Sequence, residues 1–446
     1  MRYVAVAAGF DGTLARDGRV DGRCLDALRA LSATGRKLIL VTARELRGLL
    51  EIFPEARIFD YVIAENGAVM YRSATRQSEI LAQAPPEILL QELRRRHVTP
   101  LSVGSSIVTT VQEHEREIHD ALRKLQLDFQ LVTNPGALMM LPAGVNKASG
   151  VKAALKELGV SRHNLIAIGD GENDLALFEF ADQAVAVQNA DPLVQRVADR
   201  TTQGAHCEGF LELAHELIAN DLASAVPRRK ILLGLGEDRQ EVSFVPCRDS
   251  LLVHGPPNSG KAVICNRLLE QLLAEGYQCC MIGAHLASSY PAPPDMKVFG
   301  ESHDVPRLTD ILSAIEQPTT SVVVNLAALT VETRPVFVDA LLLQLQALHD
   351  RVGRPHAVFI HQAHAFLSAH AAMAALARLS EVSMIYATSE PERLPSQVLG
   401  GVKLVVNSAT QAIAAGGVVG RMSAFRPVSG GKDALSASDA ATASGY

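Results

Sequence analysis

Short apolar segments alternate with amphipathic segments along most of this chain. The apolar runs are typical of strands that are buried on both faces of a parallel sheet. They predict strands over residues 3–8, 37–42, 164–169 and 184–187, and helical periodicity predicts helices over 24–34 and 149–158. Because strands and helices take turns, the pattern favours an α/β fold with crossover helices.

A segment from about residue 80 to residue 145 interrupts this order with secondary structure of its own. Helical patterns cover residues 87–97 and 113–125, and strand-like pieces accompany them. We therefore expect an inserted cap on a core that residues 1–222 form together.

The chain changes character after that first unit. The segment ASAVPRRK has the proline and charge content of a linker, and ILLGLGEDRQEVSFVP predicts a hairpin that turns at residues 236–238. We assign residues 223–247 to this linker and hairpin, and a second α/β unit to residues 248–420. Residues 421–446 form a tail that is rich in Gly, Ser and Ala from Pro427 onwards, and disorder is predicted there.

Length and composition narrow the class of protein. A chain of 446 residues has room for two or three domains with cores of their own. Although 48% of the residues are hydrophobic, no apolar run reaches the roughly 18 residues needed to cross a bilayer. The N-terminus carries no apolar leader with a cleavage site. We therefore predict a cytoplasmic protein without a membrane partner.

Cysteine usage and charge exclude further classes. The six cysteines are scattered and form no CxxC pair, which favours buried thiols over disulfides or a zinc site. The net charge of -6 argues against nonspecific binding of nucleic acid, which is driven by basic surface. Nucleic acid is therefore not an expected partner.

A first candidate site follows the first predicted strand. Gly9–Thr13 lie at its carboxyl end, where open α/β sheets bind ligands. The run GFDGT resembles motif I, DxDGT, of the haloacid dehalogenase superfamily, and LILVTAR, GVNKASG and IGDGENDLAL follow in the order of that family's later motifs. The segment FDYVIAENGAVMY resembles the capped, Cof-like (type IIB) subclass. The resemblance covers residues 1 to about 222, and it implies a Rossmann-like core with an inserted α/β cap.

The resemblance also implies roles for individual residues. In that family the first Asp of motif I attacks phosphorus and the second protonates the leaving group; here Gly9 stands at the first position. The residues at the remaining catalytic positions are Asp11, Thr42 and Lys147. The residues at the Mg²⁺ positions are Asp11, Asp170, Asn173 and Asp174. These residue types fit the chemistry, because a phosphate dianion needs a cation, hydroxyl donors and Mg²⁺ held by carboxylates.

Glycine at position 9 has no side chain with which to attack phosphorus or to bind a metal. Loss of such a nucleophile typically lowers a rate by about 10⁴- to 10⁶-fold, or roughly 6 to 8 kcal/mol of transition-state stabilisation. One route to hydrolysis stays open, in which Asp11 activates a water for direct attack. Two further interpretations of the remaining residues are also open: they bind phosphate or Mg²⁺, or they only maintain the fold.

A second candidate site is a loop that matches the phosphate-binding pattern GxxxxGK[ST] except at its last position. A predicted strand over 250–254 precedes it and an amphipathic helix over 262–275 follows it. Backbone amides at the helix N-terminus would hold the phosphates of ATP or another nucleotide, and the lysine would reach them. The residues concerned are Gly255, Pro256, Pro257, Asn258, Ser259, Gly260, Lys261 and Ala262. Ala262 lacks the hydroxyl that ligates Mg²⁺ in this motif.

Later segments of the second unit supply no obvious acid. The predicted strand HAVFI leads into His361 and Gln362, where the pattern of a P-loop ATPase would place an Asp and a Glu. Asn325 ends the predicted strand SVVVNL, and Gly283 follows CCMI. The unit is similar to HerA/FtsK-like P-loop ATPases over about residues 230–420, which implies a P-loop NTPase-like fold. His361 and His364 lack acidic or cysteine partners in sequence, which favours structural roles over a metal site.

These patterns lead to a main hypothesis and two others. The main hypothesis is a noncatalytic two-domain protein that binds nucleotide, and a phosphorylated small molecule or Mg²⁺, in a regulatory or assembly role. The alternative is a weakly active Mg²⁺-dependent phosphatase with an ATP-binding domain. A third, DNA translocation by an oligomeric ring, rests on family analogy alone. The sequence leaves a homo-oligomer and a protein partner open.

Overall fold

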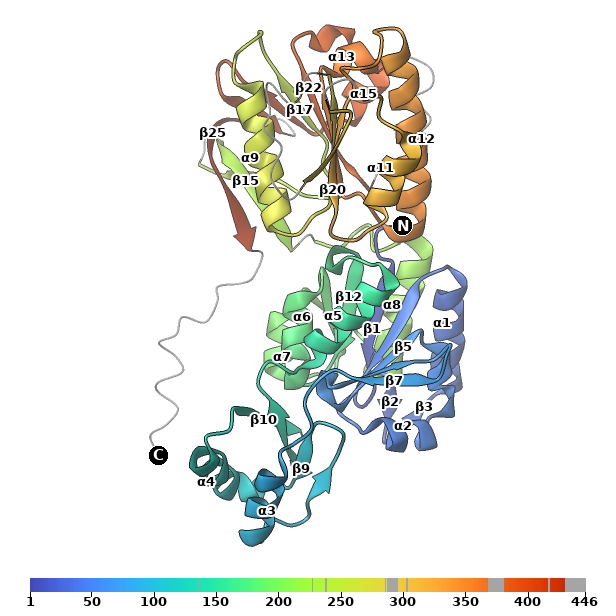
Figure 1. Ribbon diagram of the computed structural model, residues 1–446, viewed down its shortest axis with the longest axis vertical. Helices are drawn as coiled ribbons and strands as arrows, with labels where there is room; N and C mark the ends of the chain where they lie inside the picture. The colour runs from blue at the N-terminus through green and yellow to red at the C-terminus, as the bar shows by residue number, and fades with distance from the viewer. Residues whose placement is uncertain are drawn as a thin grey trace. The chain divides into compact units, whose positions relative to one another are not determined.

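The computed structural model describes residues 1–134, 136–226, 228–236, 239–284, 286, 296–301, 304–367, 381–415 and 418–429. The chain divides into two compact units (Figure 1). The first consists of Tyr3–Val226, and the second consists of Pro227–Tyr446 together with Met1–Arg2. Each unit is built on a sheet of its own.

An eight-stranded sheet forms the centre of the first unit. In spatial order its strands are β14 (Arg200–Thr201), β13 (Gln183–Ala186), β12 (Leu165–Gly169), β1 (Ala5–Gly9), β4 (Lys37–Val41), β5 (Tyr61–Ala64), β6 (Val69–Arg72) and β7 (Gln77–Ile80). Strands β14 to β5 are parallel, and β6 and β7 continue the sheet as antiparallel strands. The four predicted strands correspond to β1, β4, β12 and β13 and are confirmed.

Helices cover both faces of this sheet (Figure 1). They are α1 (Gly22–Ala33), α2 (Leu46–Ile52), α5 (Lys147–Leu158), α6 (Leu175–Phe180), α7 (Pro192–Val197) and α8 (Cys207–Asn220), and a small hairpin joins β2 (Ala15–Arg16) to β3 (Arg19–Val20). Helices α1 and α8 pack against each other. Because the chain leaves β1 for β4 on one side and returns to β12 on the other, the order of strands reverses at β1, the place where such sheets bind ligands.

The inserted cap has a four-stranded sheet and two helices. Its strands in spatial order are β10 (Phe129–Asn134), β11 (Ala137–Pro142), β9 (Val108–Thr110) and β8 (Ser102–Val103), with helices α3 (Glu87–Arg95) and α4 (Glu115–Leu125). Apolar side chains of the two helices and of β9 and β11 form one buried cluster. The predicted helices over 87–97 and 113–125 correspond to α3 and α4.

The second unit contains an eleven-stranded sheet. Its spatial order is β16 (Glu241–Phe244), β15 (Arg229–Gly236), β25 (Val418–Ser429), β24 (Ala412–Ala415), β23 (Leu404–Asn407), β17 (Leu251–His254), β22 (Ser383–Thr388), β21 (Ala357–His361), β18 (Cys279–Gly283), β20 (Ser321–Asn325) and β19 (Met296–Phe299). The strands from β23 to β19 are parallel. The predicted hairpin is confirmed as β15 and β16, while residues 237 and 238 of its turn lie outside the described residues.

Helices also cover this second sheet. They are α9 (Lys261–Ala274), α11 (Leu308–Ile315), α12 (Thr333–Val352), α13 (Ala363–Phe366) and α15 (Ser396–Gly401). In Figure 1, α9 lies on one face and α11 and α12 on the other. Two separate apolar clusters result, one under α9 and one under α11 and α12. A second α/β sheet domain is therefore present, as predicted.

The structure differs from the sequence prediction at two places. The hairpin of β15 and β16 belongs to the second sheet, because β15 pairs with β25. Residues 421–429, assigned to a disordered tail, continue strand β25, since β15 and β24 offer backbone partners on both sides. The rest of the predicted tail, residues 430–446, lies outside the described residues.

Two smaller predictions concern cysteine and membranes. All six cysteines are free and buried, as predicted, and burial raises the pKa of the Cys265 and Cys280 thiols to about 12. In the part of the chain that the structure describes, no helix is long and apolar enough to cross a membrane.

Candidate functional site

Three neighbouring parallel strands of the first unit end at the same edge. Gly9 at the end of β1 pairs with Val41 of β4, and Ala8 pairs with Ile168 of β12. The segments that follow these strands therefore come together: Gly9–Thr13, Thr42–Arg44 and Asp170–Asp174. This edge is the candidate site, and it is the one that the sequence predicted.

Lys147 reaches the site from the first position of α5. Asn146 caps that helix: its side chain accepts the N–H of Ser149 at 3.0 Å, and the Ser149 hydroxyl accepts the N–H of Asn146 at 3.1 Å. Gly67 makes room for this turn, because a Cβ on it would lie 1.9 Å from the Asn146 carbonyl oxygen. The capping box and the glycine together fix the lysine at the start of the helix.

Asp174 holds the ammonium of Lys147. The Lys147 Nζ donates to Asp174 Oδ1 at 2.7 Å and to Asn173 Oδ1 at 2.9 Å. The other oxygen of Asp174 accepts the backbone N–H groups of Asp170 and Gly171, both at 3.1 Å. Both charged side chains of this pair are buried. The pair thus neutralises itself inside the protein.

Asp170 faces the glycine loop after β1. Its Oδ1 accepts the hydroxyl of Thr13 at 2.7 Å, and a Cβ on Gly12, whose φ is +75°, would lie 1.9 Å from its Oδ2. Burial and the neighbouring charge of Asp174 raise the pKa of the Asp170 carboxyl to about 6, against the lowering effects of Thr13, Lys147 and His206. This carboxyl is therefore ionised at neutral pH in a setting that opposes its charge.

Asp11 is engaged by a residue that the sequence analysis did not single out. The Arg44 Nε donates to Asp11 Oδ2 and its terminal nitrogen donates to Asp11 Oδ1, both at 2.7 Å. The guanidinium also lies 5.7 Å from the ring centre of Phe10. Arg44 stands two residues after Thr42 in the segment LILVTAR, which is the signal that could have identified it.

The position of the missing nucleophile has little free space. A Cβ on Gly9 would lie 2.9 Å from the Thr13 hydroxyl oxygen and 3.3 Å from its Cβ. The threonine hydroxyl that binds Asp170 thus occupies the space into which a side chain at position 9 would extend. The described geometry leaves no room at this point for both an aspartate and the present position of Thr13.

The predicted set of Mg²⁺ ligands does not fit a metal ion. The carboxylate of Asp11 is paired with Arg44, and both oxygens of Asp174 accept hydrogen bonds, from Lys147 and from backbone amides. Of the three carboxylates, Asp170 is the one that forms no ion pair with a described residue, and it accepts the hydroxyl of Thr13. Among the described residues, no group of three or more His, Cys, Asp or Glu side chains is arranged to hold a metal ion. Oxygen ligands from several groups are what Mg²⁺ requires.

Thr42 and Asn173 have mainly local partners. The Thr42 hydroxyl accepts the N–H of Arg44 at 3.1 Å, so it stabilises the turn after β4. Asn173 donates to Asn66 Oδ1 at 3.1 Å, which extends the hydrogen bonds of Lys147 towards the cap. Asn66 lies in the segment FDYVIAENGAVMY, and its contact with Asn173 is not evident from that segment's pattern.

A cavity of about 370 Å³ adjoins Lys147 between the core and the cap. Lys147, Glu172 and the amides of Asn66, Gln130 and Asn173 contribute its polar lining. Its apolar lining comes from Leu131, Val132, Leu141, Val145, Leu175 and Ala176. A mixed lining of this kind is typical of a small-molecule site.

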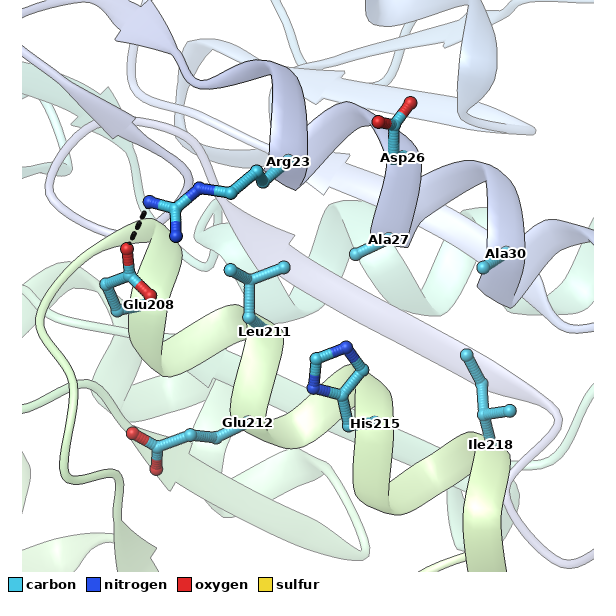
Figure 2. Close-up of a pocket in the computed structure, with 9 residues that line it drawn as sticks. All are labelled: Arg23, Asp26, Ala27, Ala30, Glu208, Leu211, Glu212, His215 and Ile218. Carbon is cyan, nitrogen blue, oxygen red and sulfur yellow. Dashed lines mark hydrogen bonds and ion pairs between the residues drawn. The ribbon is translucent and has the colours of Figure 1, made fainter.

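A larger hollow of about 580 Å³ lies elsewhere, between α1 and α8 (Figure 2). The side chains of Ala27, Ala30 and Leu211 line it, and an ion pair between Arg23 and Glu208 lies at one end. None of the predicted site residues lines this hollow, so its size alone does not make it the candidate site.

In the second unit, the residues Gly255–Gly260 join β17 to α9, and residues 256–258 of this loop are exposed. The Lys261 Nζ donates to the carbonyls of Gly255 at 2.7 Å and Pro256 at 2.6 Å. Burial lowers the pKa of Lys261. The Ser259 hydroxyl lies 2.5 Å from the hydroxyl of Ser408. Loop, lysine and helix N-terminus are thus placed together as the sequence predicted.

The strands beside this loop end without a carboxylate. Thr388, His361, Gly283 and Asn325 are the last residues of β22, β21, β18 and β20. Burial lowers the pKa of His361 to about 3, so the ring is neutral at physiological pH. The first acid beyond β22 is Glu390, whose carboxylate pairs with Arg393 at 2.7 Å and lies 3.3 Å from His364.

Comparison with known proteins identifies the first unit. The family described as haloacid dehalogenase-like hydrolase matches residues 6–98 and 82–213. A phosphoglycolate phosphatase of Methanothermobacter thermautotrophicus is 30% identical over 214 residues, which is 47% of this chain and 96% of that protein. The chain belongs to the haloacid dehalogenase-like hydrolase family.

Other members of the family are similar over the same part of the chain. A phosphoglycolate phosphatase of Halobacterium salinarum is 30% identical over 217 residues, 46% of this chain and 93% of that protein. The crystal structure of a haloacid dehalogenase-like hydrolase from Bacteroides thetaiotaomicron matches with a TM-score of 0.44 and 22% identity, over 48% of this chain and 99% of that one. The family match ends at residue 213.

Proposed function

We propose that residues 3–226 bind a phosphomonoester at the edge where β1, β4 and β12 end, with little or no turnover. The phosphatases related to this unit support the class of ligand. We expect no fast turnover because glycine stands at position 9, and glycine has no side chain that can attack phosphorus. Lys147 is the cation among the predicted residues of this edge, and it would bind the phosphate group.

The cavity beside Lys147 would hold the organic part of the ligand. Its volume of about 370 Å³ exceeds what a two-carbon acid needs, and Lys147 is the one cation among its lining residues. A ligand whose organic part bears an anionic group of its own would be repelled there by the carboxylate of Glu172. The panel of test compounds should therefore include uncharged hydroxylated phosphomonoesters as well as phosphoglycolate.

Hydrolysis is the second candidate, and the comparisons favour it because the related proteins are phosphatases. Without a carboxylate at position 9, a water would have to attack phosphorus directly, with Asp11 as the base. In the structure Asp11 is bound by Arg44, so it would have to exchange that partner for the water. Mg²⁺ would be the expected cofactor of such an activity, as it is in this family.

The test of this proposal is phosphate release from a panel of phosphomonoesters and ATP, with the wild type compared with Gly9→Asp. We expect release by Gly9→Asp and release lower by about 10⁴-fold or more by the wild type, the usual effect of removing a nucleophile. Turnover by the wild type that is lost in Asp11→Asn would instead establish hydrolysis through water. In that case the noncatalytic proposal is wrong.

For the second unit we propose that the loop Gly255–Ala262 binds ATP or another nucleotide. The position of the loop at the carboxyl end of β17, before an N-terminus of α9 that bears Lys261, supports this. Ala262 and the neutral His361 remove the usual Mg²⁺ hydroxyl and acid, so little hydrolysis is expected. This part of the proposal rests on the loop and its surroundings alone.

Nucleotide binding can be tested with a fluorescent ATP analogue. Wild type and Lys261→Ala would be titrated side by side, with Lys297→Ala as a control because that lysine lies on the edge strand β19. We expect Lys261→Ala to weaken binding by about tenfold or more, as when one charge-assisted phosphate contact of about 1.4 kcal/mol is lost. Equal affinity in all three proteins would refute nucleotide binding at this loop.

The biological role that we propose is regulation or assembly through bound ligands. A homo-oligomer and a protein partner are both compatible with it, while DNA is not expected as a partner given the net charge of -6. Stimulation of ATP hydrolysis by DNA would contradict this expectation. A cytoplasmic location also stays a prediction.

A further inference from the structure

We infer that the first unit binds the phosphate group of its ligand without a divalent cation, which sets it apart from the Mg²⁺ requirement of its family. This inference rests on the proposed binding of a phosphomonoester at the same edge. It goes beyond that proposal, because it states which chemical form of the ligand the site takes: the metal-free phosphate.

The first argument is the state of the carboxylates. A Mg²⁺ ion needs several oxygen ligands in near-octahedral geometry. Position 9 supplies none, and the two oxygens of Asp174 already accept three hydrogen bonds from Lys147 and from two backbone amides. The fork of Arg44 holds both oxygens of Asp11. A metal ion would have to displace these donors of the chain itself, which are buried at Asp174 and exposed at Asp11.

The second argument is the contact between Thr13 and Asp170. The Thr13 hydroxyl donates to Asp170 Oδ1 at 2.7 Å, and it does so from the space into which a side chain at position 9 would extend. Glycine at position 9 therefore has two effects on the site. It removes one carboxylate, and it allows a neutral hydroxyl to bind an oxygen of the carboxylate that is left.

The third argument is charge. The pairs of Asp11 with Arg44 and of Asp174 with Lys147 are neutral, so Asp170 leaves these five side chains with one net negative charge. An aspartate at position 9 would add a second negative charge, which a divalent cation would offset. Because that aspartate is absent, a phosphate that binds without a metal ion meets less repulsion. Lys147 donates two of its three ammonium hydrogens to Asn173 and Asp174, which leaves one for the ligand.

The inference predicts what Gly9→Asp does to metal binding. The new Cβ lies 2.9 Å from the Thr13 hydroxyl oxygen, so Thr13 must rotate away from Asp170. The variant thus gains one carboxylate and frees an oxygen of another. Thr13→Val is the matched control, because it removes the donor to Asp170 but adds no carboxylate.

The experiment measures hydrogen exchange of the full chain with inorganic phosphate as the probe, in EDTA and in millimolar Mg²⁺. Peptides that cover residues 5–15 and 165–176 report on this site separately from the loop at Gly255–Lys261. For the wild type, we expect the phosphate concentration that gives half protection to differ by no more than about twofold between EDTA and Mg²⁺. For Gly9→Asp, we expect Mg²⁺ to lower it by about 5- to 150-fold, the usual range of coupling between two ligands.

Mn²⁺ provides a second readout that needs no phosphate. A bound Mn²⁺ ion broadens the NMR signals of backbone amides close to it. This broadening should be absent for residues 9–13 and 170–174 in the wild type and in Thr13→Val. It should be present in Gly9→Asp. If Mn²⁺ broadens these signals in the wild type, the inference is wrong.

The outcomes separate the inference from the proposed function. Protection of the wild type by phosphate only when Mg²⁺ is present overturns the inference and leaves phosphomonoester binding in place. No protection by phosphate in either buffer overturns the proposed function, and the inference with it. Equal protection in EDTA and in Mg²⁺ supports both.

Discussion

Replacing Asp170 with asparagine is expected to stabilise the first unit at neutral pH. The pKa of this carboxyl rises from 3.8 to about 6 on folding, because burial and the charge of Asp174 disfavour its ionised form. Above pH 6 the carboxyl is ionised in both the unfolded and the folded chain, so folding must bury a charge that its surroundings disfavour. Asparagine removes the charge, and its Oδ1 can still accept the hydroxyl of Thr13.

The magnitude follows from the shift in pKa. A rise of about 2.2 pH units corresponds to about 3 kcal/mol, since one unit is about 1.36 kcal/mol. The sign is that of a raised acid: the unfavourable contribution is absent below pH 3.8, grows between pH 3.8 and about 6, and is complete above that. Asp170→Asn should thus increase the free energy of unfolding by up to about 3 kcal/mol at pH 8 and have little effect near pH 3.8.

The assay is native-state hydrogen exchange of the amides in β1 and β12, measured on the full chain at several pH values. It reports on the first unit alone, which matters because two units need not unfold together. Asp174→Asn is the matched control, and we expect it to lower the free energy of unfolding by about 3 to 5 kcal/mol, because it leaves the buried Lys147 without its counter-ion. A difference between Asp170→Asn and wild type that does not change with pH would refute the reasoning, as would destabilisation at pH 8.

Three further substitutions test parts of the scaffold. Gly67→Ala should lower the free energy of unfolding of the first unit by about 3 kcal/mol or more in urea denaturation, because its Cβ would lie 1.9 Å from the Asn146 carbonyl oxygen. Gly144→Ala is the control: this glycine also has a positive φ, but a Cβ there would meet no atom within 4 Å, so the loss should be only about 1 kcal/mol. Glu65→Gln should speed the exchange of the amides of residues 105 and 106 by about fivefold or more, because its carboxylate accepts both N–H groups at 3.1 Å; unchanged exchange would contradict this. Arg354→Met should destabilise the second unit by about 3 kcal/mol, seen as a lower midpoint in thermal unfolding, because the buried guanidinium donates to two backbone carbonyls; an unchanged midpoint would count against it.

The elements of both units could be predicted from sequence where apolar patterning and burial coincide. Strands β1 and β12, and β4 after Lys37, have no charged or polar side chains because they are buried on both faces, and this pattern needs no knowledge of the partners. Strand β25 was missed in part because its pairing partner β15 lies almost 200 residues earlier in the chain, so composition near the C-terminus was a poor guide. Long-range backbone partners decide such strands.

The candidate site could also be predicted only in part from the sequence. The residues that the motifs contain were placed at one edge by the order of the strands, and the absence of a side chain at position 9 is visible in the sequence itself. The partners of these residues were not. Arg44 on Asp11 and Thr13 on Asp170 both depend on which way side chains turn once the strands are together. That direction determines whether the acids can hold a metal ion.

The two lysines that the sequence predicts as phosphate ligands, Lys147 and Lys261, differ in how far their surroundings indicate an anionic ligand. Lys147 is needed by the fold whether or not a ligand binds, because it neutralises Asp174, and both side chains are buried. Its presence therefore has a structural reason in addition to the phosphate binding that we propose for it. Lys261 donates only to carbonyls of its own loop, and no carboxylate among the described residues pairs with it. Burial lowers its pKa, so the surrounding protein disfavours the charge instead of requiring it. A cation that the fold does not need is an indication of an anionic ligand, so the geometry of Lys261 argues for the ligand that we propose at its loop, whereas the related phosphatases are what argue for a phosphomonoester at the first site.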